Sequence, residues 1–211
     1  MSISFTPQTK LLFIGDSITD CQRNEDANHV GLGYVQRIRD YLLAADPMRA
    51  PYVMNMGISG HRITDLAGRW HNDVIAHRPD VLSVMIGIND VWHGLDGRKQ
   101  GVPVETFEAT YDQLIAQTRE LLPACKIVVC EPTVIMPPAH KDGNAYLSPY
   151  VKVVRKIGER YYADSIIPLH SAFVSAIKMR PDVAWTTDGV HPTSTGHMLI
   201  ARTWLETTRN L

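Results

Sequence analysis

Along the chain, short runs of apolar residues alternate with longer segments in which apolar positions recur at helical spacing. The short runs have the length of strands, and each reaches a glycine or a proline, residues that commonly end strands. They predict strands over residues 10–15, 52–57, 80–87, 126–132 and 165–169.

The longer segments predict helices. One begins near Thr64 as its cap and ends before Pro79, and another has Ser148 as its cap and Pro149 at its first position. Between the strand that stops at Pro132 and this second helix, residues 133–146 follow neither pattern and predict a long loop at the rim of a site. The predicted helices cover residues 34–45, 63–78, 103–122, 148–163, 171–179 and 194–208.

Strands separated by helices predict an α/β fold in which right-handed crossovers join parallel strands. The result is an open five-stranded sheet with helices on both faces. No linker, repeat or low-complexity tract divides the chain, so residues 1–211 are expected to form one domain. In such sheets, functional groups gather beyond the carboxyl ends of the strands.

Polar residues follow the first three predicted strands. Gly15-Asp16-Ser17 follows the first, the sequence NMGISG (55–60) ends the second, and GIND (87–90) follows the third. Each has an ordinary explanation, because Ser17 could cap a helix with Asp20 in a capping box and a glycine often follows a strand. Their meeting at one edge of the sheet favours a functional site instead.

A serine hydroxyl becomes a nucleophile only when a base removes its proton, and a third group must orient that base. Near the carboxyl terminus, Asp188 and His191 are separated by two residues, which lets the carboxylate reach the imidazole Nδ1–H and leaves Nε2 for Ser17. An Asp-x-x-His pair by itself is weak evidence, since the chain has nine histidines.

Composition narrows the function classes. The net charge of −1 and the pI near 6.7 give no basic surface for nucleic acid. No segment has the pattern of a signal peptide or a membrane span. The three cysteines have no CxxC spacing, which is typical of reduced thiols, so the expected location is the cytoplasm. The scattered histidines favour neither a metal site nor any other cofactor.

The motifs GDSITD, NMGISG, GIND and DGVHP occur in the order and approximate spacing of the SGNH (GDSL-type) serine hydrolases, which this chain resembles over nearly its whole length. The four residues that name that family correspond to Ser17, Gly57, Asn89 and His191. Longer stretches around these motifs also resemble the bacterial acetylxylan esterases of the family. The resemblance implies a flavodoxin-like three-layer α/β/α sandwich with a five-stranded parallel sheet.

The same resemblance implies a mechanism. Ser17 would attack an ester carbonyl, His191 would accept the proton, and Asp188 would orient and stabilise the imidazolium. The oxyanion would be held by the backbone N–H groups of Ser17 and Gly57 and by the side-chain amide of Asn89. Asp16 and Asp90 are then expected to accept hydrogen bonds locally, with Asp16 also a candidate substrate contact.

Several further residues have weaker signals. Trp92 and Trp185 are candidates for lining an acyl or sugar pocket, although packing explains either tryptophan as well. His197 is interpreted as a structural or surface histidine, and Cys21 as a buried thiol.

The expected function is hydrolysis of short acyl esters, with acetylated xylo-oligosaccharides or related carbohydrates as substrates. Two alternatives remain: a lysophospholipase, thioesterase or general esterase with the same machinery, and a binding module without turnover. The resemblance also implies a homo-oligomer, at least a dimer. Ile135 and Met136 are apolar residues of the predicted loop, and charged substitutions there are expected to weaken the assembly.

Overall fold

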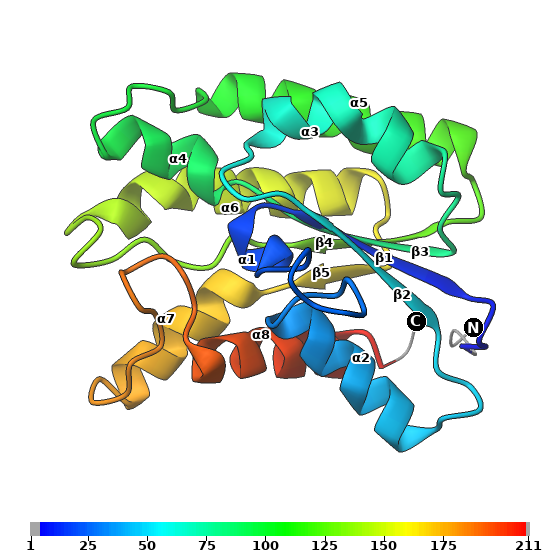
Figure 1. Cartoon of the computed structure of the whole chain (residues 1–211). Helices are drawn as coiled ribbons and strands as arrows, with labels where there is room; N and C mark the ends of the chain where they lie inside the picture. The colour runs from blue at the N-terminus through cyan, green and yellow to red at the C-terminus, as the bar shows by residue number, and fades with distance from the viewer. Residues whose placement is uncertain (1–4, 210–211) are drawn as a thin grey trace.

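Five parallel strands form the centre of the computed structural model, which describes residues 5–209. The strand order is β2-β1-β3-β4-β5 (Figure 1). In this register Gly15 lies opposite both Gly57 and Met85, so the carboxyl ends of β1, β2 and β3 are level with one another. The strands are β1 (Lys10–Gly15), β2 (Tyr52–Gly57), β3 (Val81–Met85), β4 (Lys126–Cys130) and β5 (Ser165–Ile167).

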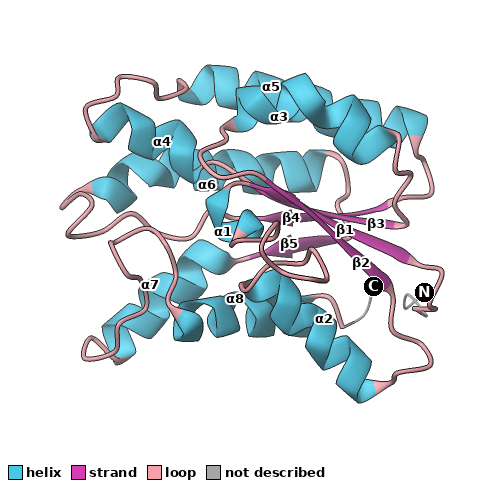
Figure 2. Cartoon of the chain, viewed as in Figure 1, coloured by secondary structure: helices cyan, strands magenta, loops and turns pink. Residues whose placement is uncertain are grey.

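Helices cover both faces of this sheet, as Figure 2 shows. Alternate side chains of β1 enter different cores, with Leu11 and Phe13 on one face and Leu12 and Ile14 on the other. The first face packs against α2 (Tyr34–Ala45), α7 (Leu169–Met179) and α8 (Ser194–Thr207), and the second against α3 (Ile63–Trp70), α5 (Val104–Leu121) and α6 (Gly143–Arg160). The predicted parallel sheet and three-layer architecture are confirmed.

One helix was not predicted. Helix α4 (Ile88–Leu95) occupies residues between the third predicted strand and the third predicted helix, where we predicted neither. Its apolar residues Ile88 and Val91 do keep helical spacing, but Asn89 and Asp90 between them are buried as well. Because polar residues share the buried face, the sequence pattern of an amphipathic helix is hidden.

The caps of two helices were also predicted wrongly. Helix α3 begins at Ile63 with Arg62 at the cap position, where the backbone N–H of Arg62 donates to the Asp65 carboxylate over 2.9 Å. Thr64 therefore lies inside the helix. After Trp70 the chain continues as a π-helix, η1 (His71–Ile75).

Helix α6 begins at Gly143, five residues before the predicted cap, and it contains Pro149 in its interior. The apolar loop before it is not a surface loop. Val134 and Ile135 are fully buried, and the backbone N–H of Ile135 donates to the Asn144 side chain on the first turn of α6. A charge at Ile135 would therefore enter the core, which contradicts the interface role that we expected for this residue.

Among residues 5–209, the helices lack the combination of length and apolar character that crossing a bilayer requires.

Candidate active site

Ser17 lies at the first position of α1 (Ser17–Asp20), a single turn that begins directly beyond β1. The helix cap is Asp16, whose carboxylate accepts a 3.0 Å hydrogen bond from the backbone N–H of Ile18. This cap leaves the Ser17 hydroxyl available for another partner. Gly15 permits the close approach of β3 to the end of β1, since a Cβ there would lie 2.3 Å from the Met85 carbonyl oxygen.

A chain of hydrogen bonds joins this serine to the loop before α8. The Ser17 Oγ lies 2.9 Å from Nε2 of His191, and Nδ1 of the same ring lies 2.7 Å from Oδ2 of Asp188. The other carboxylate oxygen of Asp188 accepts from the backbone N–H groups of Val190 and His191 over 3.0 and 2.8 Å. Asp188 therefore holds both the imidazole ring and the backbone of His191.

These contacts keep Asp188 ionised. Partial burial acts to raise its pKa, but the hydrogen bonds from the His191 ring and from the two backbone N–H groups outweigh it and hold the pKa below its ordinary value. An ionised carboxylate at Nδ1 keeps the proton on that nitrogen and leaves Nε2 as the acceptor for the serine proton.

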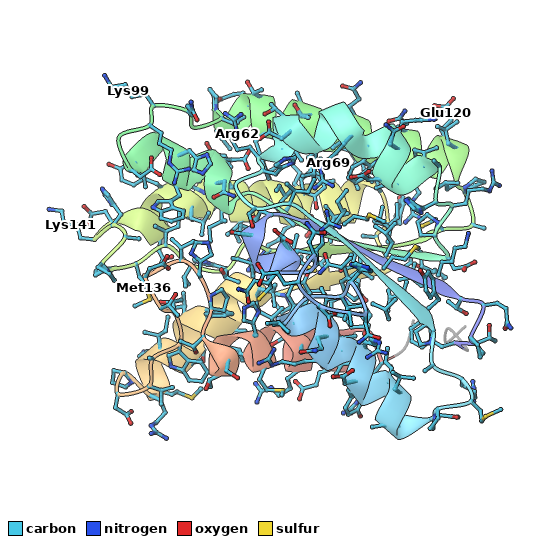
Figure 3. The ribbon with its side chains drawn as sticks, in the orientation of Figure 1. Arg62, Arg69, Lys99, Glu120, Met136 and Lys141 are labelled. Atoms are coloured by element: carbon cyan, nitrogen blue, oxygen red, sulfur yellow. The ribbon has the colours of Figure 1, made fainter. Side chains whose placement is uncertain are left out.

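The loop that carries His191 rests on the apolar loop before α6. The backbone N–H of Met136 donates to the Gly189 carbonyl over 3.0 Å, and Figure 3 labels Met136 at this end of the molecule. Gly189 has φ +91°, and a Cβ there would lie 2.1 Å from the Met136 carbonyl oxygen. The 133–142 loop thus supports the histidine.

Asn89 lies on the first turn of α4, where its amide nitrogen donates to the His61 carbonyl over 3.0 Å. An amide has two N–H donors, so this bond fixes the orientation of the group and leaves the second N–H available. The sheet order places α4, after β3, beside the Ser17 turn, after β1. The two predicted residues therefore meet at one edge, as expected.

Gly57 does not have the role that we expected. Its backbone N–H donates to the side-chain oxygen of Asn55 over 2.8 Å, so it is not available to an oxyanion. A Cβ at Gly57 would lie 2.2 Å from the Asp20 backbone nitrogen, which explains the glycine by the close approach of α1. The structure thus contradicts the assignment of Gly57 as an oxyanion donor.

Gly60, the second glycine of NMGISG, lies in the exposed turn beyond β2 with φ +83° and with open space where a Cβ would be. No described residue accepts a hydrogen bond from its backbone N–H. Its neighbours are held on both sides, because Ser59 Oγ donates to Asp20 over 2.6 Å and the His61 carbonyl accepts from Asn89. Our sequence analysis missed Gly60, although the spacing of two glycines in the motif offered the choice.

Two carboxyl groups are buried beneath the site. Burial raises the pKa of both Asp16 and Asp90 to about 7, and the hydrogen bonds from backbone N–H groups to each carboxylate oppose this rise only in part. Oδ1 of Asp90 accepts from the backbone N–H of Ile63 over 3.0 Å, and its Oδ2 has no partner among the described residues. Asp16 accepts locally, as expected, whereas the partner of Asp90 comes from the start of α3. Asp16 is only 2% exposed, which contradicts its role as a substrate contact.

The two tryptophans differ in position. The half-buried Trp92 makes an edge-to-face contact with the His191 ring, with 5.6 Å between ring centroids. The guanidinium carbon of Arg98 lies over the Trp92 ring, 5.7 Å from the ring centroid. Trp185 donates its indole N–H to the Arg180 carbonyl over 3.0 Å. Trp92 therefore forms a wall beside the histidine, whereas Trp185 packs at the base of the His191 loop.

His197 is a structural histidine, as we expected. Its Nδ1 accepts from the backbone N–H of Tyr34 over 3.2 Å, and burial, followed by the charge of Arg37, lowers its pKa to about 4. Its Nε2 lies 3.6 Å from the Cys21 sulfur. Cys21 is partly rather than fully buried, and burial raises the pKa of its thiol.

Known proteins share this architecture. Residues 13–199 match the model of the GDSL-like lipase/acylhydrolase family. The chain is 36% identical over 210 residues to an acetylxylan esterase of Geobacillus stearothermophilus, an alignment that covers 93% of this chain and 92% of that protein. A solved structure from Parabacteroides merdae, described as a GDSL-like lipase, has a TM-score of 0.91 at 36% identity and covers 100% of both chains.

The solved structure of Axe2, the acetylxylan esterase of Geobacillus stearothermophilus, has a TM-score of 0.86 at 35% identity, covering 98% of this chain and 96% of that one. Structures of Axe2 described as catalytic mutants replace a serine, an aspartate or a histidine by alanine. From these matches, this chain belongs to the GDSL-like lipase/acylhydrolase family and is a carboxylic ester hydrolase.

Proposed function

We propose that this protein removes acetyl groups from acetylated xylo-oligosaccharides or related carbohydrates through a Ser17-His191-Asp188 triad. The observation that carries the proposal is the continuous hydrogen-bond chain from Ser17 Oγ through the His191 ring to Asp188. The residue types agree with those replaced in the catalytic mutants of Axe2.

In the first half-reaction, Ser17 Oγ attacks the ester carbonyl while Nε2 of His191 accepts the hydroxyl proton. The resulting imidazolium lies 2.7 Å from the Asp188 carboxylate, which stabilises its charge. His191 then returns the proton to the departing sugar oxygen, which leaves an acetyl-serine. A water molecule, deprotonated by His191, releases acetate and restores the serine.

Three donors suit the tetrahedral oxyanion. They are the backbone N–H of Ser17 at the start of α1, the backbone N–H of Gly60, and the second amide N–H of Asn89. Gly60 replaces Gly57 in this set because its N–H is without an acceptor among the described residues, whereas that of Gly57 is bonded to Asn55. Donors fixed in place before the reaction need no reorganisation when the charge develops.

The relatives support acetylated xylo-oligosaccharides as the substrate class, since an Axe2 structure is described as an acetyl-xylooligosaccharide esterase. The half-buried Trp92 beside His191 offers a flat apolar surface of the kind on which sugar rings stack. A lysophospholipase or thioesterase needs an extensive apolar surface to bind a long acyl chain. The residues after Asn89 are largely polar, which favours a short acyl group.

The decisive test compares Ser17→Ala with wild type in p-nitrophenyl acetate turnover and in acetate release from acetylated xylo-oligosaccharides. We expect the variant to lose activity at least a thousandfold, on the order of the losses seen for triad nucleophiles, with an unchanged thermal transition. Ser171→Ala is the matched control, because Ser171 is exposed and its hydroxyl accepts a single hydrogen bond among the described residues, from Arg155 over 3.2 Å.

Esters of acetyl, butyryl and octanoyl groups then test the acyl chain, and we expect kcat/KM to be highest for acetyl. Full activity of Ser17→Ala would refute the triad. A strong octanoyl preference would move the function to the lipid or thioester class, and an inactive wild type would favour a binding module.

A further inference from the structure

Arg69, near the end of α3, binds four acceptors with a single guanidinium group. Its Nη1 donates to the Met56 carbonyl over 2.7 Å and to the Asp73 carboxylate over 2.5 Å. Its Nη2 donates to the Gly15 carbonyl over 3.1 Å, and its Nε donates to Nδ1 of His61 over 3.1 Å. The side chain is only 12% exposed, and Figure 3 labels it where α3 meets the sheet.

Three of these four acceptors belong to residues close in sequence to Ser17 or Gly60. Gly15 is two residues before Ser17, and Met56 is the last residue but one of β2, ahead of the turn that contains Gly60. His61 directly follows Gly60, and its carbonyl accepts the Asn89 amide. One side chain therefore links the strand end that carries the serine to both sides of the turn that carries the oxyanion donor.

The contact with His61 has a defined proton arrangement. An arginine can only donate, so Nδ1 of His61 must be unprotonated to accept from Nε. Partial burial and then the charge of Arg69 lower the pKa of His61, which keeps the ring neutral. The ring is thereby fixed against Arg69, and the backbone at residues 60–61 is fixed with it.

The tethers on the other side of the turn do not replace this one. Asp20 holds Ser59, and the Arg23 Nε donates to the Gly57 carbonyl over 2.6 Å. Both contacts come from residues at or just beyond the end of α1 and hold residues 57–59, and the backbone N–H of Ile58 also donates to the Gly15 carbonyl over 3.1 Å. The His61 side of the Gly60 turn is held by Asn89 and Arg69, and of these two only Arg69 also binds the end of β1.

We propose that Arg69 is a positioning residue of the esterase, which sets the distance between the Ser17 nucleophile and the Gly60–Asn89 oxyanion donors. The inference rests on the proposed function. Arg69 touches no reacting atom, so its effect passes through Gly15, Met56 and His61. Because a misplacement of about 1 Å can cost about a hundredfold in rate, the expected signature is a loss in kcat with little change in KM.

A purely structural role would also follow from a buried guanidinium, and the chain offers a matched control. Arg119 on α5 binds three backbone carbonyls, those of Cys125, Tyr161 and Tyr162, over 3.0 to 3.1 Å, and it lies 3.5 Å from Asp164. It does so where β4 begins, at the edge of the sheet opposite the site. Arg119→Gln removes similar bonds without reaching the catalytic groups.

The experiment measures kcat and KM for p-nitrophenyl acetate, together with the thermal transition, for Arg69→Gln, Arg69→Lys and Arg119→Gln. We expect Arg69→Gln to lower kcat about 10- to 100-fold with KM within about twofold of wild type. Arg119→Gln should lower the transition temperature and leave kcat unchanged. Arg69→Lys keeps the charge but cannot reach four acceptors, so its kcat should fall nearly as far.

A double-mutant cycle with Asn89→Ala tests the route of the effect. If Arg69 acts through the oxyanion donors, Arg69→Gln should slow an Asn89→Ala enzyme much less than it slows wild type. Wild-type kcat in Arg69→Gln, full activity in Arg69→Lys, or additive losses in the cycle would each overturn the proposal. Should Arg69→Gln fail to fold, the Lys variant decides by the same criteria. An inactive wild type would instead count against the proposed function.

Discussion

Single residues at this site have burial and bonding that differ sharply from those of their neighbours in sequence. Ser17 keeps its hydroxyl for His191 because the adjacent Asp16 caps the helix, and Asn89 donates its amide to the His61 carbonyl while the adjacent Asp90 accepts from Ile63. Asp16 holds the first turn of α1, which presents Ser17, whereas Asp90 holds the start of α3, two residues after the His61 carbonyl that accepts the Asn89 amide. The buried acids therefore link the stability of the site to pH.

Asp90 makes this link testable. Burial raises its folded-state pKa to about 7, above the ordinary value of 3.8, so its neutral form stabilises the fold below the ordinary pKa, and that stability is lost as the pH rises through 7. Between pH 5 and pH 8, linkage therefore lowers the free energy of unfolding by about 2–3 kcal/mol, which corresponds to about 5–10 °C in Tm.

We therefore expect the Tm of wild type, relative to that of Asp90→Asn, to fall by about this amount from pH 5 to pH 8. Calorimetry of both proteins at the two pH values measures the difference. Asp46→Asn, on the surface, provides the control and should give a constant difference. A constant difference for Asp90→Asn as well would show that Asp90 is ionised throughout.

At the scale of elements, the site depends on loops that hold one another. The His191 loop rests on residues 133–142, and this loop is anchored through Ile135 to the first turn of α6. The Gly60 turn is bound to α1 on one side and to α3 and α4 on the other. Ser17 and Asn89 thus lie on the first turns of helices, whereas Asp188, His191 and Gly60 come from loops that neighbouring segments hold in place.

Gly189 tests the contact between two of these loops. A Cβ at Gly189 would collide with the Met136 carbonyl, so Gly189→Ala should displace the His191 loop and lower kcat more than about tenfold. Steady-state turnover of p-nitrophenyl acetate measures the effect. Gly97→Ala is the matched control, because φ at Gly97 is +85° but open space surrounds it.

Both alanines carry the cost of a positive φ, about 1 kcal/mol of stability, and only Gly189→Ala adds the collision. Equal kcat values for the two variants would mean that the loop contact does not control the histidine.

At the scale of the whole molecule, the sheet aligns the ends of β1, β2 and β3, and residues separated by more than 170 positions meet at one edge. The homo-oligomer stays a prediction. The burial of Ile135 removes the surface that we had assigned to it, while the small net charge still allows identical copies to approach.

Light scattering at micromolar concentration measures the oligomeric state directly. We expect a mass of at least twice the 23.6 kDa of the chain. A mass near 23.6 kDa would show a monomer. A charge at Ile135 would disrupt the core, so charged Ile135 variants cannot test the interface. Met136 is only partly buried, and Met136→Lys is therefore the variant that tests whether this loop contributes to assembly.

The sequence by itself determined the architecture, because strand and helix periodicities record which faces are buried, and β1 and α2 appear where the pattern predicts them. It also predicted Ser17 and Asn89 from motifs that follow strand ends, and Asp188 and His191 from the Asp-x-x-His motif near the carboxyl terminus, and the structure joins Ser17, His191 and Asp188 by hydrogen bonds. Only the tertiary structure distinguished Gly60 from Gly57. Both are glycines in one motif, and they differ because the Asn55 side chain occupies the backbone N–H of Gly57, whereas no described residue accepts from the backbone N–H of Gly60.

Hydrogen bonds to other segments also explain why the sequence pattern predicted neither α4 nor the proposed role of Arg69. Burial of Asn89 and Asp90 is favourable only because residues 61–63 supply their partners, so no local periodicity reveals the helix. Arg69 looks like any charged residue on an amphipathic helix, and its importance comes from carbonyl groups on two other strands. Hydrogen-bond partners far apart along the chain are set by packing, and a pattern read along one segment contains no information about them.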